Sequence, residues 1–329
     1  MRVRVVRPPA LALVALGLLG CLTGCARAID GVAVPASSSV PSAMSASKEL
    51  GDFGTIQPCA LVDIPTLPAD LQAELEPPDS FDACSLRVNS AGAAIQLDVG
   101  ALVYDDDDAD DTGPQHLPSG LQLYIGSVQE QSCSAYLKFA ENIELTSVAY
   151  ANDGDGTADL CTTAAEVARN VSTVLAKGPV QHRTYPAASF ANVDPCPLLT
   201  DDTLVPLGFK AADHDAYPAH HECDWNDGLQ NNDVLSASLS FIVGPAPAAA
   251  PNGGTAEQIA GRSSVLISTT DDSAAECWID TAGPPFGAQS NLVEIAEIYL
   301  SDADQSTDTA CQVGTTLAAA VWPKLPPAS

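Results

Sequence analysis

The sequence predicts an α+β protein made of two tandem copies of one antiparallel-sheet module with flanking helices and two disulfides in each copy. One observation is the cysteine spacing. Eight cysteines after residue 50 form two sets of four, with gaps of 25, 49 and 28 residues in the first set and 27, 54 and 34 in the second. Another is that their flanks repeat, as Pro58-Cys59 and Pro195-Cys196 do. Both observations indicate an internal duplication.

The third observation is that both halves have the same order of expected elements. The first half is expected to contain a short helix over 68–75, strands from residue 84 and over 95–104, 121–125, 133–139 and 144–150, and a helix from residue 161. The second half is expected to contain a helix over 201–207, strands from residue 223 and over 234–243, 264–268, 277–280 and 292–300, and a helix from residue 311. Strands flanked by helices, rather than alternating with them, favour an antiparallel sheet with helices on one face.

The period of the apolar residues identifies these elements. Ile95 and Leu97 alternate with polar residues, as in a half-buried strand. After residue 161, apolar residues recur at helical spacing up to Leu175, and Gly178 ends this helix. Pro323 ends the second closing helix in the same way.

The eight cysteines are expected to form four disulfides, because an even number of cysteines is typical of proteins in an oxidising compartment. The expected pairs are Cys59–Cys84, Cys133–Cys161, Cys196–Cys223 and Cys277–Cys311. Each would fasten a helical segment to a neighbouring strand and stabilise the fold by about 3–4 kcal/mol. Other pairings within a module stay open.

Residues 1–24 have the features of a lipoprotein signal peptide. Arg2, Arg4 and Arg7 precede an apolar run over 10–21, which is too short to remain as a membrane-spanning helix. Leu-Thr-Gly-Cys at 22–25 is similar to the lipobox, in which the chain is cut before a cysteine that carries diacylglycerol. We therefore expect Cys25 to be lipidated, with an ordinary signal and a chance cysteine as the alternative.

A tether and two modules are expected behind this anchor. Residues 25–51 are expected to be a lipidated tether, because Ala, Ser, Val and Pro dominate without an apolar period. The first α+β module is expected over 52–178 and the second over 190–329. The second module is expected to fold alone from Phe190 to Ser329.

The charge of the chain excludes nucleic acid as a partner. Lysine and arginine number 13 against 42 aspartates and glutamates, which gives a formal net charge of -29. Such a surface repels phosphate backbones. The hydrophobic share of 46% and the charged share of 17% are typical of a folded globular chain.

The candidate ligand-binding residues lie in the second module. All three tryptophans are there, and Trp225 and Trp278 each lie within two residues of a cysteine. His220 and His221 precede the same cysteine as Trp225. Aromatic faces beside polar groups are typical of small-molecule grooves, so binding is expected mainly in this module. For the tryptophans themselves, packing on disulfides in the core is the favoured interpretation, and a ligand groove lined by them is the functional alternative.

Neither a metal site nor a cofactor is expected. The histidine-rich stretch 213–223, which includes His214, could bind zinc or copper, but the His-Glu-x-x-His motif fails at Trp225. The acidic stretches 105–111 and 152–156 do not complete a calcium loop, because the twelfth position from residue 153 is Ala164. Solvated loops are the favoured interpretation of all three stretches, with a metal site as the alternative.

The chain resembles the actinobacterial lipoproteins of unknown function and the related extracellular sensor domain of some mycobacterial receptor kinases. The resemblance rests on the lipobox, the tether, Pro-Cys-x-Leu-Leu at 195–199, Cys-x-Trp at 223–225 and a late cysteine that opens an amphipathic helix. It covers 56–177 and 193–322 as two copies. It implies a disulfide-held α+β module with a groove and without enzymatic activity, and it supplies no catalytic residues.

The expected function is therefore that of an extracytoplasmic lipoprotein, anchored in the cell membrane through Cys25, that binds or senses a ligand and is not an enzyme. Its partners would be the membrane and an unknown small molecule or envelope protein. No nucleophile motif or phosphate-binding loop is present. Catalytic triads are defined by geometry, so an envelope hydrolase is the alternative, together with an accessory subunit of an envelope complex.

Overall fold

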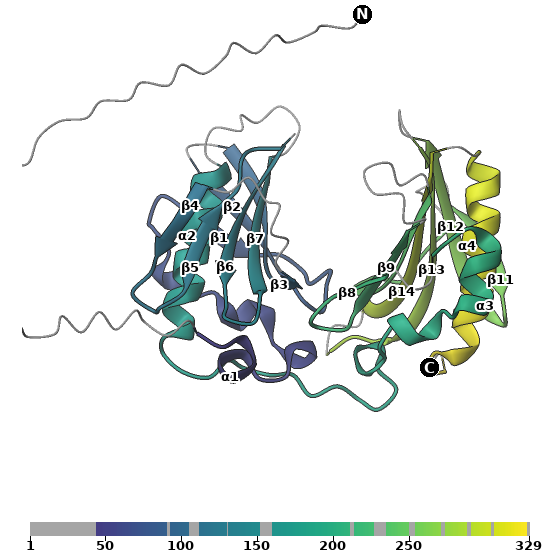
Figure 1. The fold of residues 1–329 in the computed structure, drawn as a ribbon, viewed down its shortest axis with the longest axis horizontal. Helices are drawn as coiled ribbons and strands as arrows, with labels where there is room; N and C mark the ends of the chain where they lie inside the picture. Colours follow the sequence, from purple (N-terminus) through teal and green to yellow (C-terminus); the bar gives the residue numbers. More distant parts are fainter. Residues whose placement is uncertain are drawn as a thin grey trace, which may run out of the picture. The chain divides into compact units, whose positions relative to one another are not determined.

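The computed structural model describes residues 44–327 except 91–92, 105–111, 130, 152–159, 211–213, 227–234, 250–253, 271–273, 288–290 and 304–305. These residues form two seven-stranded antiparallel sheets, each covered on one face by a long helix (Figure 1). The expected α+β class is confirmed. In the described part of the chain, no helix combines the length and the apolar character needed to cross a membrane.

The first sheet consists of β1 (Gln72–Leu75), β2 (Cys84–Ser90), β3 (Ala93–Tyr104), β4 (Thr112–His116), β5 (Gln122–Ile125), β6 (Ser132–Lys138) and β7 (Ile143–Ala151). Their order across the sheet is β1-β2-β3-β7-β6-β5-β4. The helix α1 (Ala46–Leu50) precedes the sheet, and α2 (Leu160–Leu175) follows it. Short 3-10 helices lie between α1 and β1 at Phe53–Thr55, Pro58–Leu61 and Ile64–Thr66.

The second sheet consists of β8 (His214–Ala216), β9 (Glu222–Asn226), β10 (Leu235–Pro245), β11 (Thr255–Ile259), β12 (Arg262–Thr270), β13 (Ala275–Pro285) and β14 (Leu292–Asp302). From the β8 edge the order is β8-β9-β10-β14-β13-β12-β11, the same path as in the first sheet. The helix α3 (Asp201–Leu204) precedes the sheet and α4 (Thr307–Val321) follows it. The shared strand order confirms the tandem arrangement.

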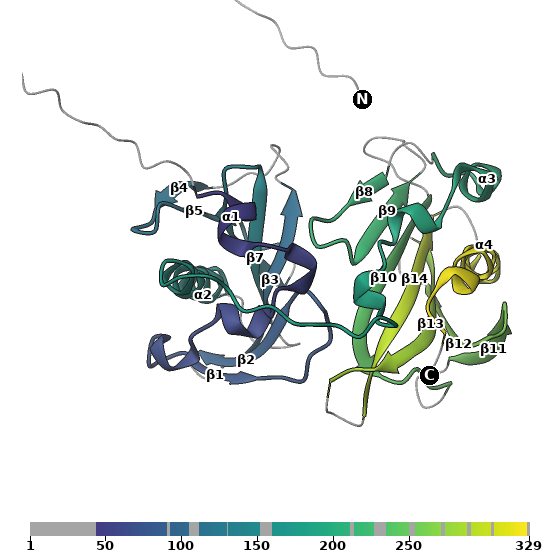
Figure 2. The ribbon, with the colours of Figure 1, turned by 90° about the horizontal axis from the view of Figure 1, so that it is seen from below.

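The hydrophobic core of each module lies between one face of its sheet and its long helix (Figure 2). In the first module, Leu86 and Leu97 are fully buried and belong to the same core as Val167 of α2. In the second module, α4 approaches β13 so closely that a Cβ on Gly314 would lie 2.9 Å from the Cδ1 of Ile279. The strands alternate buried and less buried residues because only one face of each sheet packs against a helix.

Four disulfides join the pairs that the sequence predicts. They are Cys59–Cys84, Cys133–Cys161, Cys196–Cys223 and Cys277–Cys311. In each module one bond joins the segment before the sheet to its second strand, and the other joins the sixth strand to the long helix. The bonds therefore fasten the helical layer to the sheet at two points.

The boundaries at the start of the first module differ from those expected. Residues 46–50 of the predicted tether form α1, and Ala46 and Leu50 are fully buried in the first core. With five residues, this helix is too short to show an apolar period, so it was not predicted from the sequence. The helix expected over 68–75 is instead a turn followed by the edge strand β1, whose residues are mostly exposed and therefore do not alternate. Cys25 and the signal peptide lie outside the described residues.

The connection between β1 and β2 contributes to the second core. Both modules belong to one compact unit. Phe81 is 1% exposed and packs in the hydrophobic core of the second module. Its neighbour Ser80 forms an isolated β-bridge with Ile242, and the amide of Val243 donates to the carbonyl oxygen of Asp79 over 3.1 Å. The sheet and the disulfides of residues 190–329 are self-contained, as expected, but the core of this segment includes a side chain from the first half, so its folding alone stays a prediction.

Candidate functional site

The two candidate tryptophans lie on opposite faces of the second sheet. Trp225 is 2% exposed and is part of the core, so it does not line a groove. Trp278 is half-buried on the other face, where its ring lies 5.1 Å from that of Tyr299. Their distance from a cysteine explains the difference. Trp225 follows buried Cys223 by two residues and shares its face, whereas Trp278 follows buried Cys277 by one and points away.

The two candidate histidines do not join Trp278 in one site. His220 is exposed at a turn with a positive φ of 59°, and its Nδ1 lies 3.6 Å from a carboxylate oxygen of Asp194. His221 is 2% exposed. Its Nδ1 lies 2.6 Å from Oδ1 of Asp82, and its Nε2 lies 3.2 Å from the carbonyl oxygen of Ala191.

His221 is held as an imidazolium because both ring nitrogens face acceptors. Burial alone would lower its pKa, but the hydrogen bond and the charge of Asp82 raise the pKa above its ordinary value. Asp82 belongs to the first module, so this ion pair joins the two halves of the chain. His221 is therefore a structural contact between the modules rather than a ligand group.

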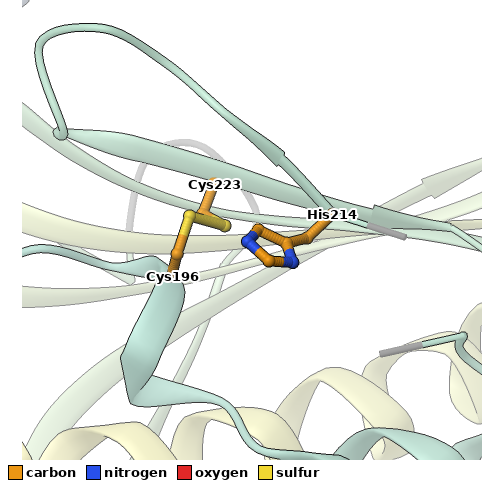
Figure 3. Close-up of side chains that lie close together, drawn as sticks. All are labelled: Cys196, His214 and Cys223. Atoms are coloured by element: carbon orange, nitrogen blue, oxygen red, sulfur yellow. A yellow bond between two sulfur atoms is a disulfide. The ribbon is translucent and has the colours of Figure 1, made fainter. Parts of the chain in front are cut away.

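One potential metal cluster is ruled out by its chemistry. Figure 3 shows His214 beside Cys196 and Cys223, with the ligand atoms of the three residues within 4.8 Å of one another. The two sulfurs form a disulfide, so neither can serve as a thiolate ligand. The acidic stretches 105–111 and 152–156 lie outside the described residues.

Carboxyl groups gather on the face of the second sheet that is turned away from α4. The strand register places Glu222, Ser240, Glu297 and Asp280 in one row across four neighbouring strands. The next row contains Asp224, Ser238, Tyr299 and Trp278. We call these eight residues the acidic face. The sequence did not reveal it, because its members are spread over four strands and only the register brings them together.

Burial raises the pKa of each carboxyl group on the acidic face. It raises the pKa of Glu222 to about 7, with added repulsion from Asp224 and Asp82. Burial also raises the pKa of Asp224, although the hydroxyl of Tyr217 donates to its Oδ2 over 2.8 Å. The charged forms of these acids are therefore destabilised in the folded protein.

Asp280 and Glu297 lie opposite each other on β13 and β14 and titrate as a pair. Burial raises the pKa of Asp280 to about 6 and that of Glu297 to about 7, and the charge of Asp280 adds to the rise at Glu297. Full ionisation of the pair is therefore disfavoured relative to two separate carboxyl groups in water.

The carboxyl groups of the acidic face lack positive partners. Among the described residues, no lysine or arginine forms an ion pair with any of them. Oδ1 of Asp224 and Oδ1 of Asp280 are buried without a hydrogen-bond partner. The face therefore combines buried acceptor oxygens with an aromatic pair, an arrangement suited to a cation.

Comparisons with known proteins found no relative of this chain. A scan against protein-family models and searches of curated proteins and of solved structures gave no match to this chain.

Proposed function

We propose that the protein is an extracytoplasmic lipoprotein, anchored through a lipid on Cys25, whose second module binds an organic cation on the acidic face without catalysing a reaction. The four disulfides fit an extracytoplasmic location. The observation that carries the ligand assignment is the group of four carboxyls beside Trp278 and Tyr299, which form no ion pair with a lysine or arginine in the described part of the chain. The lipid anchor rests on the lipobox sequence at 22–25.

The carboxyl groups favour a positively charged ligand for an electrostatic reason. A cation near Glu222 and Asp280 would offset the cost of ionising them in a partly desolvated place, so binding would release protons. Ion pairs are stronger there than in bulk water.

The aromatic pair favours an organic cation over a metal ion. Indole and phenol rings attract ammonium and quaternary ammonium groups through their faces but do not ligate hard metal ions. Trp278 and Tyr299 lie in the row beside Glu297 and Asp280. A ligand with an ammonium group and a small apolar body would contact both rows.

The alternatives from the sequence have less support. A carboxyl group with a raised pKa, as in the pair of Asp280 and Glu297, is what an envelope hydrolase would use as a general acid, but these two groups are hydrogen-bonded to each other. Ser240 lies beside Glu297 in the same row, but its hydroxyl hydrogen-bonds the carboxyl of Glu222, and the two rows of the acidic face contain no histidine to activate it. The proposal therefore remains a binding protein.

The test compares choline with 3,3-dimethylbutan-1-ol, which has the same shape without the charge. Isothermal titration calorimetry of the intact protein should show choline binding that strengthens from pH 5 to pH 8 as the carboxyls ionise. Glu222→Gln should weaken it several-fold, whereas Glu257→Gln, on the exposed strand β11, should leave it unchanged. Equal binding of the neutral alcohol, or unchanged choline binding in Glu222→Gln, would contradict the cation site.

The anchor has a separate test. Mass spectrometry of the membrane fraction should find diacylated Cys25 as the first residue of the mature chain. A mature chain without lipid that begins elsewhere would contradict the anchoring and leave the ligand assignment untouched.

A further inference from the structure

A cavity lies where the linker between the modules passes the ends of β13 and β14. Its volume is about 640 Å³, within the range of small-molecule sites. Its walls are mainly apolar and include Pro78, Tyr185, Pro186, Pro285 and Phe286. Arg183 and Glu294 are the charged residues that line it. The acidic face contributes no residue to this cavity.

The aromatic wall of the cavity is held by the core. Phe81, which is buried, contacts the rings of both Tyr185 and Phe286 edge-on, with centroids 5.6 Å apart in each case. The linker wall is fixed by the backbone. The amide of Arg183 donates to the carbonyl oxygen of Thr55 over 2.6 Å. The walls of the cavity are therefore fixed by packing and hydrogen bonds, and they come from three parts of the chain.

The polar groups that line the cavity are incompletely hydrogen-bonded within the described part of the chain. Burial raises the pKa of Tyr185, and the nearby charge of Arg183 opposes this rise, so the two side chains lie together. The guanidinium of Arg183 lies over the ring of Phe286, 5.2 Å from its centroid, and forms no salt bridge with any described carboxylate. Nη1 of Arg183 and the hydroxyl oxygen of Tyr185 are buried without a hydrogen-bond partner. Burial of such groups is unfavourable unless an acceptor reaches them.

Glu294 does not supply that acceptor. Its Oε1 accepts a hydrogen bond from the hydroxyl of Ser189 and its Oε2 accepts one from the amide of Phe190, both over 2.6 Å. It is 2% exposed. Its carboxyl group is thus engaged on the protein side of the wall.

We propose that this cavity binds a small carboxylic acid with an aromatic or bulky apolar body, with its carboxylate placed at Arg183 and Tyr185. A guanidinium and a phenol hydroxyl together match the two oxygens of a carboxylate. The prolines and Phe286 would contact the apolar body. This site is distinct from the acidic face and takes the opposite charge.

The test uses 1-naphthylacetate and its neutral counterpart 1-naphthylacetamide as probes of the intact protein, with binding followed by the probe's fluorescence and by calorimetry. The acid should bind at least about tenfold more tightly than the amide, which corresponds to one charge-assisted hydrogen-bonded contact. Choline should not compete with it. Equal affinities, or no binding of 1-naphthylacetate up to about 10 mM, would overturn the proposal.

Variants locate the binding. Arg183→Gln should reduce the affinity for 1-naphthylacetate about tenfold and leave 1-naphthylacetamide unchanged, and Tyr185→Phe should reduce it about threefold. Arg169→Gln, which removes an arginine paired with Glu166 on α2, is the matched control and should have no effect. Should Arg183→Gln fail to fold, Arg183→Lys should keep part of the preference for the acid. Full retention of that preference in a folded Arg183→Gln protein would overturn the proposal.

Discussion

The open faces of the two sheets, which point away from the long helices, can be compared position by position because the cysteines fix the alignment. Cys84 and Cys223 lie on the second strand of each sheet, and Cys133 and Cys277 lie on the sixth. Counting from them and following the strand register matches most positions of the two faces, except around the register shift between Val99 and Leu102 of β3, which β10 lacks.

The matched positions of the open faces differ in chemistry. In the first module they are Ser85, Ser134, Tyr136, Thr146 and Val148, and in the second they are Asp224, Trp278, Asp280, Glu297 and Tyr299. The first face keeps Asp98, whose pKa is raised by burial and whose carboxylate accepts a hydrogen bond from Ser85. Three carboxyls and a tryptophan thus replace neutral, mostly small residues in the second module.

The core faces differ in another way. The opposed pair Leu86 and Leu97 of the first module corresponds to Trp225 and Ala237 of the second. All four are buried, and the larger ring faces the smaller side chain. Packing preserves the volume of the core, whereas the open face can change freely because no helix covers it. The shared fold therefore constrains the core face, and the two modules can differ in function on the open face.

The largest expected effect concerns the independence of the two modules. Phe81→Ala should lower the free energy of unfolding by about 3–5 kcal/mol, because it leaves a cavity in the second core. The loss should appear in the second module although the residue belongs to the first. Urea unfolding followed by tryptophan fluorescence reports this, since all three tryptophans are in the second module. Leu75→Ala, at a position 59% exposed, is the control and should change little. An unchanged tryptophan transition in Phe81→Ala would show that the modules fold independently.

Removing the equivalent disulfide from each module in turn tests whether the stabilities of the two modules depend on it equally. Replacing Cys59 and Cys84 by serine, or Cys196 and Cys223 by serine, should cost about 3–4 kcal/mol in each case, because the closed loops span 25 and 27 residues. Urea unfolding of both double variants under oxidising conditions measures the two losses. A difference of more than about 2 kcal/mol between them would contradict equal roles.

The acidic face should make stability fall as pH rises. Glu222 and Glu297 have folded-state pKa values of about 7, above the ordinary value, so between about pH 4.5 and 7 the folded chain keeps protons that the unfolded chain has lost. The free energy of unfolding should therefore decrease by about 2–3 kcal/mol over this window. Deprotonation of His221 also lowers the free energy of unfolding as pH rises, since the pKa of His221 is raised in the folded protein.

Glu297→Gln isolates the contribution of the acidic face. The amide keeps a donor toward Asp280 but does not titrate, so the decrease between pH 4.5 and 7 should become smaller by about 1–2 kcal/mol. Glu257→Gln should leave the profile unchanged. Urea unfolding at a series of pH values measures both, and a steeper decrease in Glu297→Gln would contradict the assigned pKa direction.

The smallest effect on stability is expected from exchanging one open-face residue for its counterpart. Trp278→Ser gives the second module the residue that the first has at Ser134, and should change the free energy of unfolding by less than about 1 kcal/mol. The same variant should weaken choline binding several-fold, because the ring face is lost. Calorimetry with choline and urea unfolding separate the two. A large loss of stability would mean that Trp278 is part of the core.

The features predictable from the sequence are those that recur along the chain. Cysteine spacing predicted the duplication and all four disulfides, and apolar periods located α2 and α4. The edge strands β1, β4, β8 and β11 were not predicted, because exposed or short strands show no alternation of apolar and polar residues. The position of Trp225 in the core could have been predicted from its two-residue distance from Cys223.

The candidate site was not predictable, because it depends on strand register and on long-range contacts. Glu222 and Glu297 are 75 residues apart in the sequence and share a row only through β10. Phe81 shows no local sign that it packs in the other module's core. Burial, which raises the pKa of these acids, follows from the folded arrangement rather than from neighbours in sequence.

The ion pair between Asp82 and His221 shows what joining two copies in one chain makes possible. Each residue lies two positions before an equivalent cysteine, Cys84 or Cys223, so the contact joins corresponding positions of the two modules. In a symmetric pair of identical modules, a position that contacts its own counterpart meets a copy of itself. Two aspartates or two histidinium groups would repel each other there. Where equivalent positions meet, only copies that differ in sequence can place an acid against an imidazolium, so duplication within one polypeptide permits an attraction at this contact that a symmetric homodimer of single modules could not have there.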